Sequence, residues 1–147
     1  MNQGFDKLTI ADEMMESAIE SYLDHKRYFA VLNLAGVAQE IYGKWIRING
    51  GKDLPSQSMA ILENVHKETG EEFERGKFIK LVNLPKNTIK HFDSVSDRCA
   101  ILEPNLDCYI QLVEALAEHK HLNRPVTDNI ARLEAYIRRS KVQPPTT

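Results

Sequence analysis

The feature that most constrains the fold is a long stretch, residues 27–48, in which apolar side chains recur at helical spacing around most of the helix circumference. Six of them form one stripe and three more widen it: Val31, Leu34, Ala38, Ile41, Tyr42 and Trp45, then Phe29, Leu32 and Val37. A helix that is apolar on so many sides lies at the centre of a bundle or in a subunit interface. Gly36 interrupts it at a cost of about 1 kcal/mol relative to alanine, so we expect a neighbouring segment to approach the backbone closely there.

Helical periodicity also dominates the rest of the chain, whereas alternating strand patterns are nearly absent. Apolar spacing and capping residues predict these further helices: one capped by Thr9, one over 56–70 capped by Ser56, a short one over 71–81, one that begins at Pro104, and one capped by Thr127. We therefore expect an all-α fold, an antiparallel bundle of four long helices plus one or two short ones. It should form a single domain over residues 1–142, followed by a disordered tail at 143–147.

Charge is distributed unevenly, although the whole chain carries a net charge of only −2. Residues 1–25 hold six acidic residues and one lysine, a net charge of −5, while residues 74–91 hold five basic residues and one glutamate, a net charge of +4. Charge blocks of this size are most often solvated faces. The basic block is nevertheless the first place to look for a phosphate-bearing partner.

No stretch of the sequence approaches the ~18 apolar residues of a membrane span, and residues 1–6 lack the apolar core of a secretion signal. Cys99 and Cys108 lie nine positions apart without a C-x-x-C pair, which favours reduced packing residues over a disulfide or a zinc site. We expect a cytoplasmic protein that makes no membrane contact.

The segment with the clearest chemical character is Lys86-Asn87-Thr88-Ile89-Lys90-His91. In a helical conformation its lysines, asparagine and histidine share one face, because positions three to five apart lie close together. A histidine can accept and donate a proton near pH 7, a fixed cation can offset charge on phosphoryl oxygens, and an asparagine can hold a ribose hydroxyl. The pattern predicts a phosphodiester site, with a solvated basic turn after a proline as the alternative.

Two patches of the sequence carry a family resemblance: the run Leu34-Ala35-Gly36-Val37-Ala38-Gln39-Glu40-Ile41 and the downstream K-N-x-x-K-H of residues 86–91. Together they resemble small bacterial proteins of the HEPN superfamily, helical bundles whose signature is often written R-N-x-x-x-H. Lys86, Asn87 and His91 stand in the signature positions, and Asp93 follows as an acidic residue often does in that family. The similarity extends from the first expected helix through the loop after residue 97.

The resemblance implies a homodimer in which the two signature segments face each other across a cleft. Active members are metal-independent ribonucleases, frequently toxins of toxin–antitoxin or defence systems, so the implied partners are RNA or a nucleotide and an antitoxin protein. In them the histidine acts as acid or base while the ribose 2′-OH attacks its own phosphate. The implied site residues, with no metal and no cofactor, are His91, Lys86 and Asn87 for catalysis and Lys90, Lys80 and Lys77 for phosphate or RNA binding.

One position departs from the family pattern, because Lys86 stands where an arginine is expected. Arginine holds two phosphate oxygens with a planar fork, whereas lysine is a mobile point charge. Losing one preorganised contact to developing charge typically costs about 2.7–4 kcal/mol in the transition state. Two functions therefore stay open: a slow ribonuclease, which we rank slightly ahead, and a non-catalytic HEPN module that binds a nucleotide or a protein.

Two Glu-x-x-His patterns suggest a different kind of site, a di-metal carboxylate centre in a four-helix bundle. The motifs and the candidates for the remaining ligands are Glu63-Asn64-Val65-His66, Glu118-His119-Lys120-His121, Glu16, Glu20 and Glu40. Both motifs lie near expected helix ends, where we expect solvated side chains and a favourable dipole contact for His119 and His121. We therefore rank this alternative below the phosphodiester site.

A third class of function is pure interaction through the helix at 27–48. Tyr42 and Trp45 could anchor a partner or a dimer contact, although we favour the interpretation that they fill the domain's own core. No G-x-G-x-x-G, Walker loop, G-x-S-x-G or cysteine–histidine nucleophile pattern is present, which argues against redox, nucleotide-hydrolysing and acyl-transfer enzymes. No helix combines an apolar face with the row of base-reading side chains that a helix-turn-helix requires.

Overall fold

Four long helices make up most of the part of the chain that the computed structural model describes, which is residues 1–54, 57, 63, 67–68, 70 and 85–142. The helices are α1 (Lys7–Glu20), α2 (Tyr28–Ile48), α5 (Pro104–His121) and α6 (Asp128–Val142). Shorter helical turns cover Ser21–His25, 85–88 and Val95–Arg98, and no strand occurs among these residues. The predicted all-α bundle is confirmed, whereas the helices predicted over 56–70 and 71–81 and the tail 143–147 lie largely or wholly outside the described residues.

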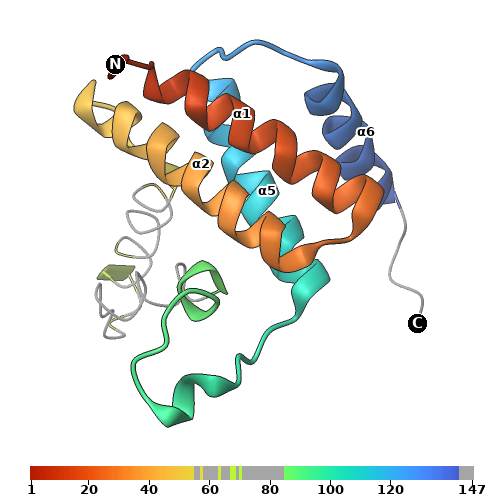
Figure 1. Cartoon of the computed structure of the whole chain (residues 1–147). Helices are drawn as coiled ribbons and strands as arrows, with labels where there is room; N and C mark the ends of the chain where they lie inside the picture. Colours follow the sequence, from red (N-terminus) through yellow and green to blue (C-terminus); the bar gives the residue numbers. More distant parts are fainter. Residues whose placement is uncertain (55–56, 58–62, 64–66, 69, 71–84, 143–147) are drawn as a thin grey trace.

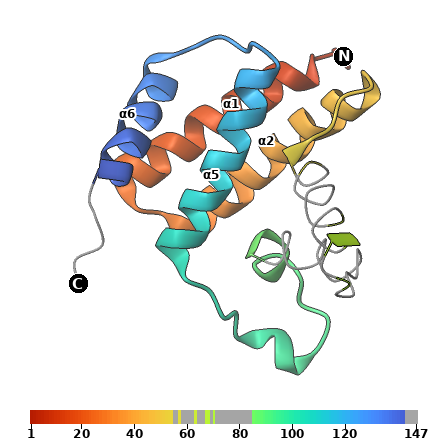
Figure 2. The same cartoon turned by 180° about the vertical axis from the view of Figure 1, so that it is seen from behind.

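α2 lies at the centre of the described bundle. It runs antiparallel to α1, which lies beside it, and α5 packs against another side of it (Figure 1). α6 lies against α1, on the far side from α2, as the view from behind also shows (Figure 2). The sequence left two positions open for this helix, the centre of the bundle or a subunit interface, and the structure packs it against both α1 and α5.

The cap of α1 is Asp6, three residues before the predicted Thr9. The Asp6 carboxylate accepts a hydrogen bond from the Leu8 N–H at 3.1 Å, and the Thr9 hydroxyl donates to the same carboxylate at 3.3 Å. The prediction of Thr9 was wrong because aspartate is an equally good cap, and a helix that begins earlier adds Leu8 to the packing against the core.

The other helix boundaries follow their predicted signals. Pro104 occupies the first turn of α5, and the Thr127 hydroxyl accepts from the Ile130 N–H at 3.2 Å at the start of α6. The polar break between the first two helices is the connection Lys26-Arg27, in which Lys26 adopts a left-handed φ of 53°. α2 ends before Gly50, whose φ of 81° suits a glycine.

The core is built where α1, α2, α5 and α6 meet. Its fully buried members (exposed fraction at most 1%) are Ala11, Met15, Ala18, Ile19, Val31, Leu32, Ala35, Ala38, Tyr42, Cys108, Leu112, Ala115, Ile130 and Leu133. Cys108 is thus a packing residue as predicted, but Cys99 is exposed, so that prediction holds for one cysteine only.

No helix among the described residues is long and apolar enough to cross a membrane.

Trp45 is the largest departure from the expected core. Its side chain is 44% exposed, whereas Tyr42 is completely buried, so the interpretation that both fill the core was wrong for Trp45. The reason is rotational: two side chains three residues apart on a helix differ in direction by about 60°. This difference keeps Tyr42 between the helices and brings Trp45 to the edge of the buried side, where it is partly exposed.

Asp12 joins α1 to α2 and to the loop before α6. Its carboxylate accepts the Tyr42 hydroxyl at 2.7 Å and the Arg124 guanidinium at 2.7 and 3.1 Å. Its side chain is only 24% exposed. These bonds fix how three parts of the chain sit relative to one another, and charge-assisted bonds of this kind are stronger than neutral ones.

We predict that Asp12→Ala lowers the free energy of unfolding by about 2–3 kcal/mol, because the change leaves the Tyr42 hydroxyl and the Arg124 guanidinium without their acceptor. Urea unfolding followed by circular dichroism measures the effect. Glu13→Ala, at the exposed neighbouring position, is the matched control and should stay within about 0.5 kcal/mol of the wild type. An equal loss of unfolding free energy in both variants would show that the bonds to the Asp12 carboxylate do not stabilise the fold.

Candidate functional site

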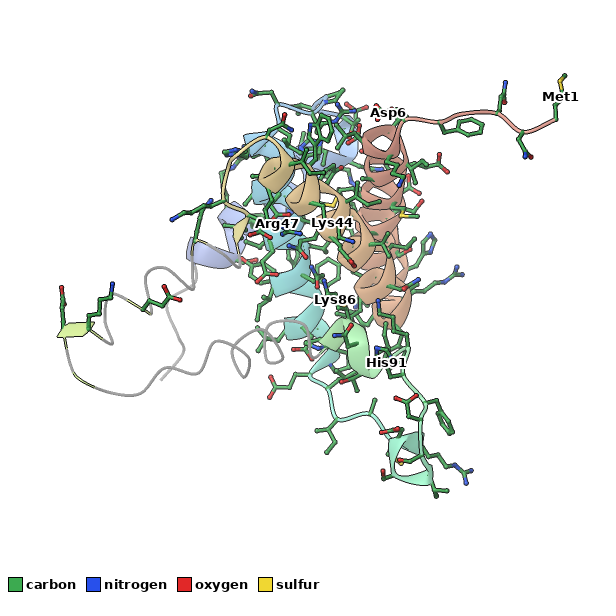
Figure 3. The ribbon with its side chains drawn as sticks, turned by 90° about the vertical axis from the view of Figure 1, so that its left-hand side faces the viewer. Met1, Asp6, Lys44, Arg47, Lys86 and His91 are labelled. Carbon is green, nitrogen blue, oxygen red and sulfur yellow. The ribbon has the colours of Figure 1, made fainter. Side chains whose placement is uncertain are left out.

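The Lys86–His91 segment is a short helical turn followed by an exposed bend. Residues 85–88 are helical, and the backbone N–H groups of Lys90 and His91 both bond to the Asn87 carbonyl, at 3.2 and 3.1 Å. Because the helix continues for only one turn, Lys86 and His91 do not share a face. Lys86 points toward the bundle and His91 lies at its surface (Figure 3).

Lys86 is buried against α2, with an exposed fraction of 8%. Its stem lies across Gly36, so closely that a Cβ at Gly36 would be 3.1 Å from the Lys86 Cδ and 3.2 Å from its Cβ. This is the close approach that the glycine in an apolar helix predicts. The neighbour is not a helix backbone, however, but the aliphatic part of a residue expected in a phosphate site.

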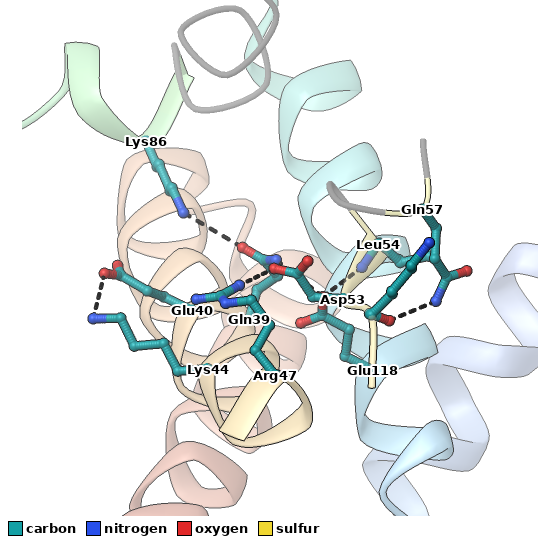
Figure 4. Close-up of polar contacts among 10 residues, drawn as sticks. Gln39, Glu40, Lys44, Arg47, Asp53, Leu54, Gln57, Lys86 and Glu118 are labelled. Atoms are coloured by element: carbon teal, nitrogen blue, oxygen red, sulfur yellow. Dashed lines mark hydrogen bonds and ion pairs between the residues drawn. The ribbon is translucent and has the colours of Figure 1, made fainter. Parts of the chain in front are cut away.

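The ammonium group of Lys86 ends in a polar interior. Its Nζ donates to the Oε1 of Gln39 at 3.4 Å (Figure 4). Burial lowers the pKa of Lys86, and the charges of Glu40, Glu114 and Glu118 oppose that effect. Lys86 therefore contacts protein groups with the atom that would be needed for a phosphate.

Gln39 also forms a hydrogen bond to Glu118 on α5. The Gln39 Nε2 donates to the Glu118 Oε1 at 3.2 Å, and the same oxygen accepts the Leu54 N–H at 3.1 Å. Glu118 is only 2% exposed, and its Oε2 has no partner among the described residues. Burial raises the pKa of Glu118 to about 7, although the bonds from Leu54 and Gln39 lower it in part.

A second buried carboxylate lies beside Glu118. Asp53 is 3% exposed and pairs with the guanidinium of Arg47, whose side chain is 45% exposed. Gly43 makes room for both acids, since a Cβ there would lie 3.2 Å from the Asp53 Oδ2 and 3.3 Å from the Glu118 Oε1. The turn after α2 is thereby held against α2 and α5.

We refer to Lys86, Gln39, Glu118, Asp53 and Arg47 together as the interior network. It joins the end of α2, the turn at 85–88 and α5 (Figure 4). Lys86, Gln39 and Glu118 are bonded in series, Glu118 also accepts from the Leu54 backbone, and Arg47 pairs with Asp53. These bonds give most of the buried polar groups a partner, whereas the Oε2 of Glu118 has none among the described residues.

The exposed end of the segment presents Lys90 and His91 to solvent. The pKa of Asp97 lies below its ordinary value, first because the backbone N–H groups of Asp93 and Ser94 donate to it and in a smaller part because His91 is nearby. Asn87 is half-buried between the two ends. Lys77 and Lys80, the other predicted phosphate-binding residues, lie outside the described residues.

The second Glu-x-x-His motif is not solvated in the way that its place near a helix end predicts. Glu118 and His119 are both 2% exposed, while His121 is exposed. In the part of the chain that the structure describes, no group of three or more His, Cys, Asp or Glu side chains could hold a metal ion. His66 of the first motif lies outside that part.

His119 is a buried polar residue, so the expectation of a solvated side chain at this position was wrong. Its ring packs edge-on against Tyr42, with centroids 5.9 Å apart, and its Nδ1 has no partner within the described chain. Burial lowers the pKa of His119, and the charge of Asp12 opposes that effect. The available signal was its spacing: His119 follows Leu112, Ala115 and Leu116 at seven, four and three positions on the apolar side of α5.

Comparison with models of protein families, with curated proteins and with solved structures gives no match to this chain.

Gly36→Val should lower the free energy of unfolding by about 1–3 kcal/mol, because the added side chain meets the Lys86 stem and overpacks the contact. Gly4→Val is the control, since nothing lies within 4 Å of a Cβ at that position. If the contact is the cause, the double variant Gly36→Val/Lys86→Ala should lose less free energy of unfolding than the sum of the losses in the two single variants. Strict additivity in denaturant unfolding would rule the contact out.

Glu118 should make the protein less stable as the pH rises from about 4.5 to about 7. In that window the folded state holds a proton on Glu118 that the unfolded state has lost, so folding binds protons and the free energy of unfolding falls with pH. Glu118→Gln should remove this loss, on the order of 2 kcal/mol, because the amide oxygen still accepts from Leu54 and carries no charge.

The measurement is urea unfolding across that pH range, read as the difference between the variant and the wild type. Glu13→Gln, at an exposed site, should follow the wild-type profile. Parallel profiles for Glu118→Gln and the wild type would show that the carboxyl titrates as it does in the unfolded chain.

Proposed function

We propose that this protein is a non-catalytic, HEPN-like module that binds the phosphates of RNA or of a nucleotide through the exposed end of the Lys86–His91 segment. The observation that carries the proposal is the orientation of Lys86. Its ammonium group is buried and bonded to Gln39, and a cation in that position is not available to stabilise charge that develops on a phosphate outside the bundle.

Lys90 and His91 support a binding role for the remaining surface. Both are exposed. A lysine and a histidine next to each other can contact one phosphate group. Contacts of this kind give affinity without reading base identity, and they weaken as salt is added.

A ribonuclease remains the second candidate because His91 is exposed and near the carboxylate of Asp97. A histidine can accept a proton from an attacking hydroxyl and donate one to a leaving group. In this version Lys90 rather than Lys86 supplies the cation, and a second copy of the chain supplies the facing segment that the resemblance implies.

The test is binding and cleavage of a labelled single-stranded RNA in the presence of a chelator. We expect fluorescence anisotropy to show binding that weakens from low to physiological salt, with no cleavage product on a denaturing gel. Lys90→Glu should weaken binding by about fivefold and lower the dependence on salt by about one charge. His91→Ala should weaken it less.

Lys52→Glu, the same charge reversal at another exposed site, is the matched control and should have a much smaller effect. Equal effects of Lys52→Glu and Lys90→Glu would leave only non-specific attraction and contradict the proposed site. Cleavage that disappears in His91→Ala would replace the binding module with the ribonuclease. No binding at low salt would overturn both.

A further inference from the structure

Three segments of the bundle meet at a groove of about 450 Å³: the turn after α1, the start of α5 and the end of α6. The cartoon shows these segments close together from both sides (Figures 1 and 2). Each segment contributes one tyrosine and α5 adds two apolar residues, so the lining includes Tyr22, Tyr109, Tyr136, Pro104 and Leu106. We refer to it as the tyrosine groove. Apolar and aromatic walls with a few polar groups are typical of sites for small molecules.

The three tyrosine rings meet at large angles. Tyr22 and Tyr136 pack edge to face, with centroids 5.6 Å apart and an interplanar angle of 87°. Tyr109 is tilted by 57° against Tyr136, with centroids 6.3 Å apart. Rings in contact at such angles do not stack face to face, so π-faces remain to line the groove. A π-face carries partial negative charge and attracts a cation within about 6 Å.

Hydrogen bonds hold this lining in place. The Tyr22 hydroxyl donates to the Asn105 Oδ1 at 2.6 Å and lies 3.4 Å from the Tyr136 hydroxyl. Ser140, the other residue of α6 in the lining, donates to the Tyr136 carbonyl at 2.9 Å. The Asn105 oxygen and the Ser140 hydroxyl are therefore already engaged within the protein. A primary ammonium, which needs several acceptors, finds few of them in this groove.

Glu103 is the only charged residue among the described residues that line the groove. Its side chain is exposed, and no hydrogen bond or ion pair within the described part of the chain reaches its carboxylate. An unpaired carboxylate beside aromatic walls attracts a cation and repels an anion. The charge of the groove therefore favours a positively charged ligand.

The helix ends at the groove do not reverse this preference. A helix start favours anions, but Pro104 in the first turn of α5 has no N–H, and the Asp107 carboxylate already accepts the Glu103 N–H at 2.9 Å. α6 ends at Val142, and the carbonyl end of a helix favours cations. The exposed Arg139 near this end is not part of the lining.

We propose that the tyrosine groove binds a trimethylammonium group, the head of a small quaternary ammonium ion. The methyl groups of such a head suit apolar walls, and its charge needs no hydrogen-bond acceptor. The π-faces of the tyrosines and the carboxylate of Glu103 balance that charge. The inference goes beyond the proposed function, because it uses no residue of the Lys86–His91 segment.

The test compares choline with 3,3-dimethylbutan-1-ol, in which a neutral tert-butyl group of nearly the same size replaces the trimethylammonium group. Ligand-observed NMR titration of the wild type measures both affinities. We expect choline to bind at least about fivefold more tightly, because the charge is what distinguishes it from its isostere. Glycine betaine, which adds a carboxylate, should bind more weakly than choline because Glu103 repels that group.

Tyr109→Leu should weaken choline binding by about fivefold, since it removes one ring from the lining. Tyr109→Phe keeps the ring and should stay within about twofold of the wild type. Tyr28→Leu is the matched control, because Tyr28 is half-buried and its ring lies 6.2 Å from that of Tyr22 without lining the groove. Its affinity for choline should also stay within about twofold of the wild type.

Glu103→Gln should weaken choline binding and narrow the difference between choline and betaine, because it removes the charge that separates these ligands. Glu13→Gln, the same change at an exposed site on α1, should leave that difference unchanged. Circular dichroism of each variant separates loss of binding from loss of the fold, and the comparison of ligands on the wild type needs no variant.

The same head group occurs free in solution and on phosphatidylcholine. Cosedimentation with phosphatidylcholine vesicles that Tyr109→Leu abolishes would assign the lipid as the source, whereas choline binding without cosedimentation would assign a soluble ion. Equal affinity for choline and its isostere would overturn the proposal, because it shows an apolar groove that does not recognise charge. Choline binding that Tyr109→Leu and Tyr28→Leu weaken equally, or no detectable choline binding by the wild type, would also overturn it.

Discussion

Charges buried between helices must find partners, and the described part of this bundle is arranged around that requirement. Gln39 accepts from the Lys86 ammonium and donates to the Glu118 carboxyl group, so a single amide connects two titratable side chains that come from different segments. Two glycines of α2, seven residues apart on one side of the helix, make the arrangement possible. Gly36 admits the lysine stem, and Gly43 admits the two acids.

The same arrangement limits what the protein can do. Because Lys86 is buried in the interior, its ammonium group is not available at the surface. The segment that carries the family resemblance then exposes two reactive side chains, Lys90 and His91. A binding role follows more directly from such a segment than a catalytic one, because catalysis needs a cation fixed where charge develops.

Much of the fold could be predicted from the sequence because helical periodicity, capping residues and helix-ending glycines are local signals. The central position of α2 followed from its apolar circumference. The errors have physical causes. Asp6 and Thr9 are both suitable caps for α1, and a difference in direction of about 60° separates the buried Tyr42 from the partly exposed Trp45. Glu118 and His119 were expected in water, but the chain after α2 and the loop before α6 cover the end of α5.

The sequence by itself determined where the four long helices of the described chain lie, which of them is central and that something must approach Gly36. Only the tertiary structure decided that the approaching group is Lys86. Spacing within a six-residue motif specifies which side chains are neighbours along the chain, but the direction in which each points depends on where the helical turn ends and on what lies across from it. Here one turn of helix at 85–88 and a glycine on α2 turned the lysine inward and left the histidine outside.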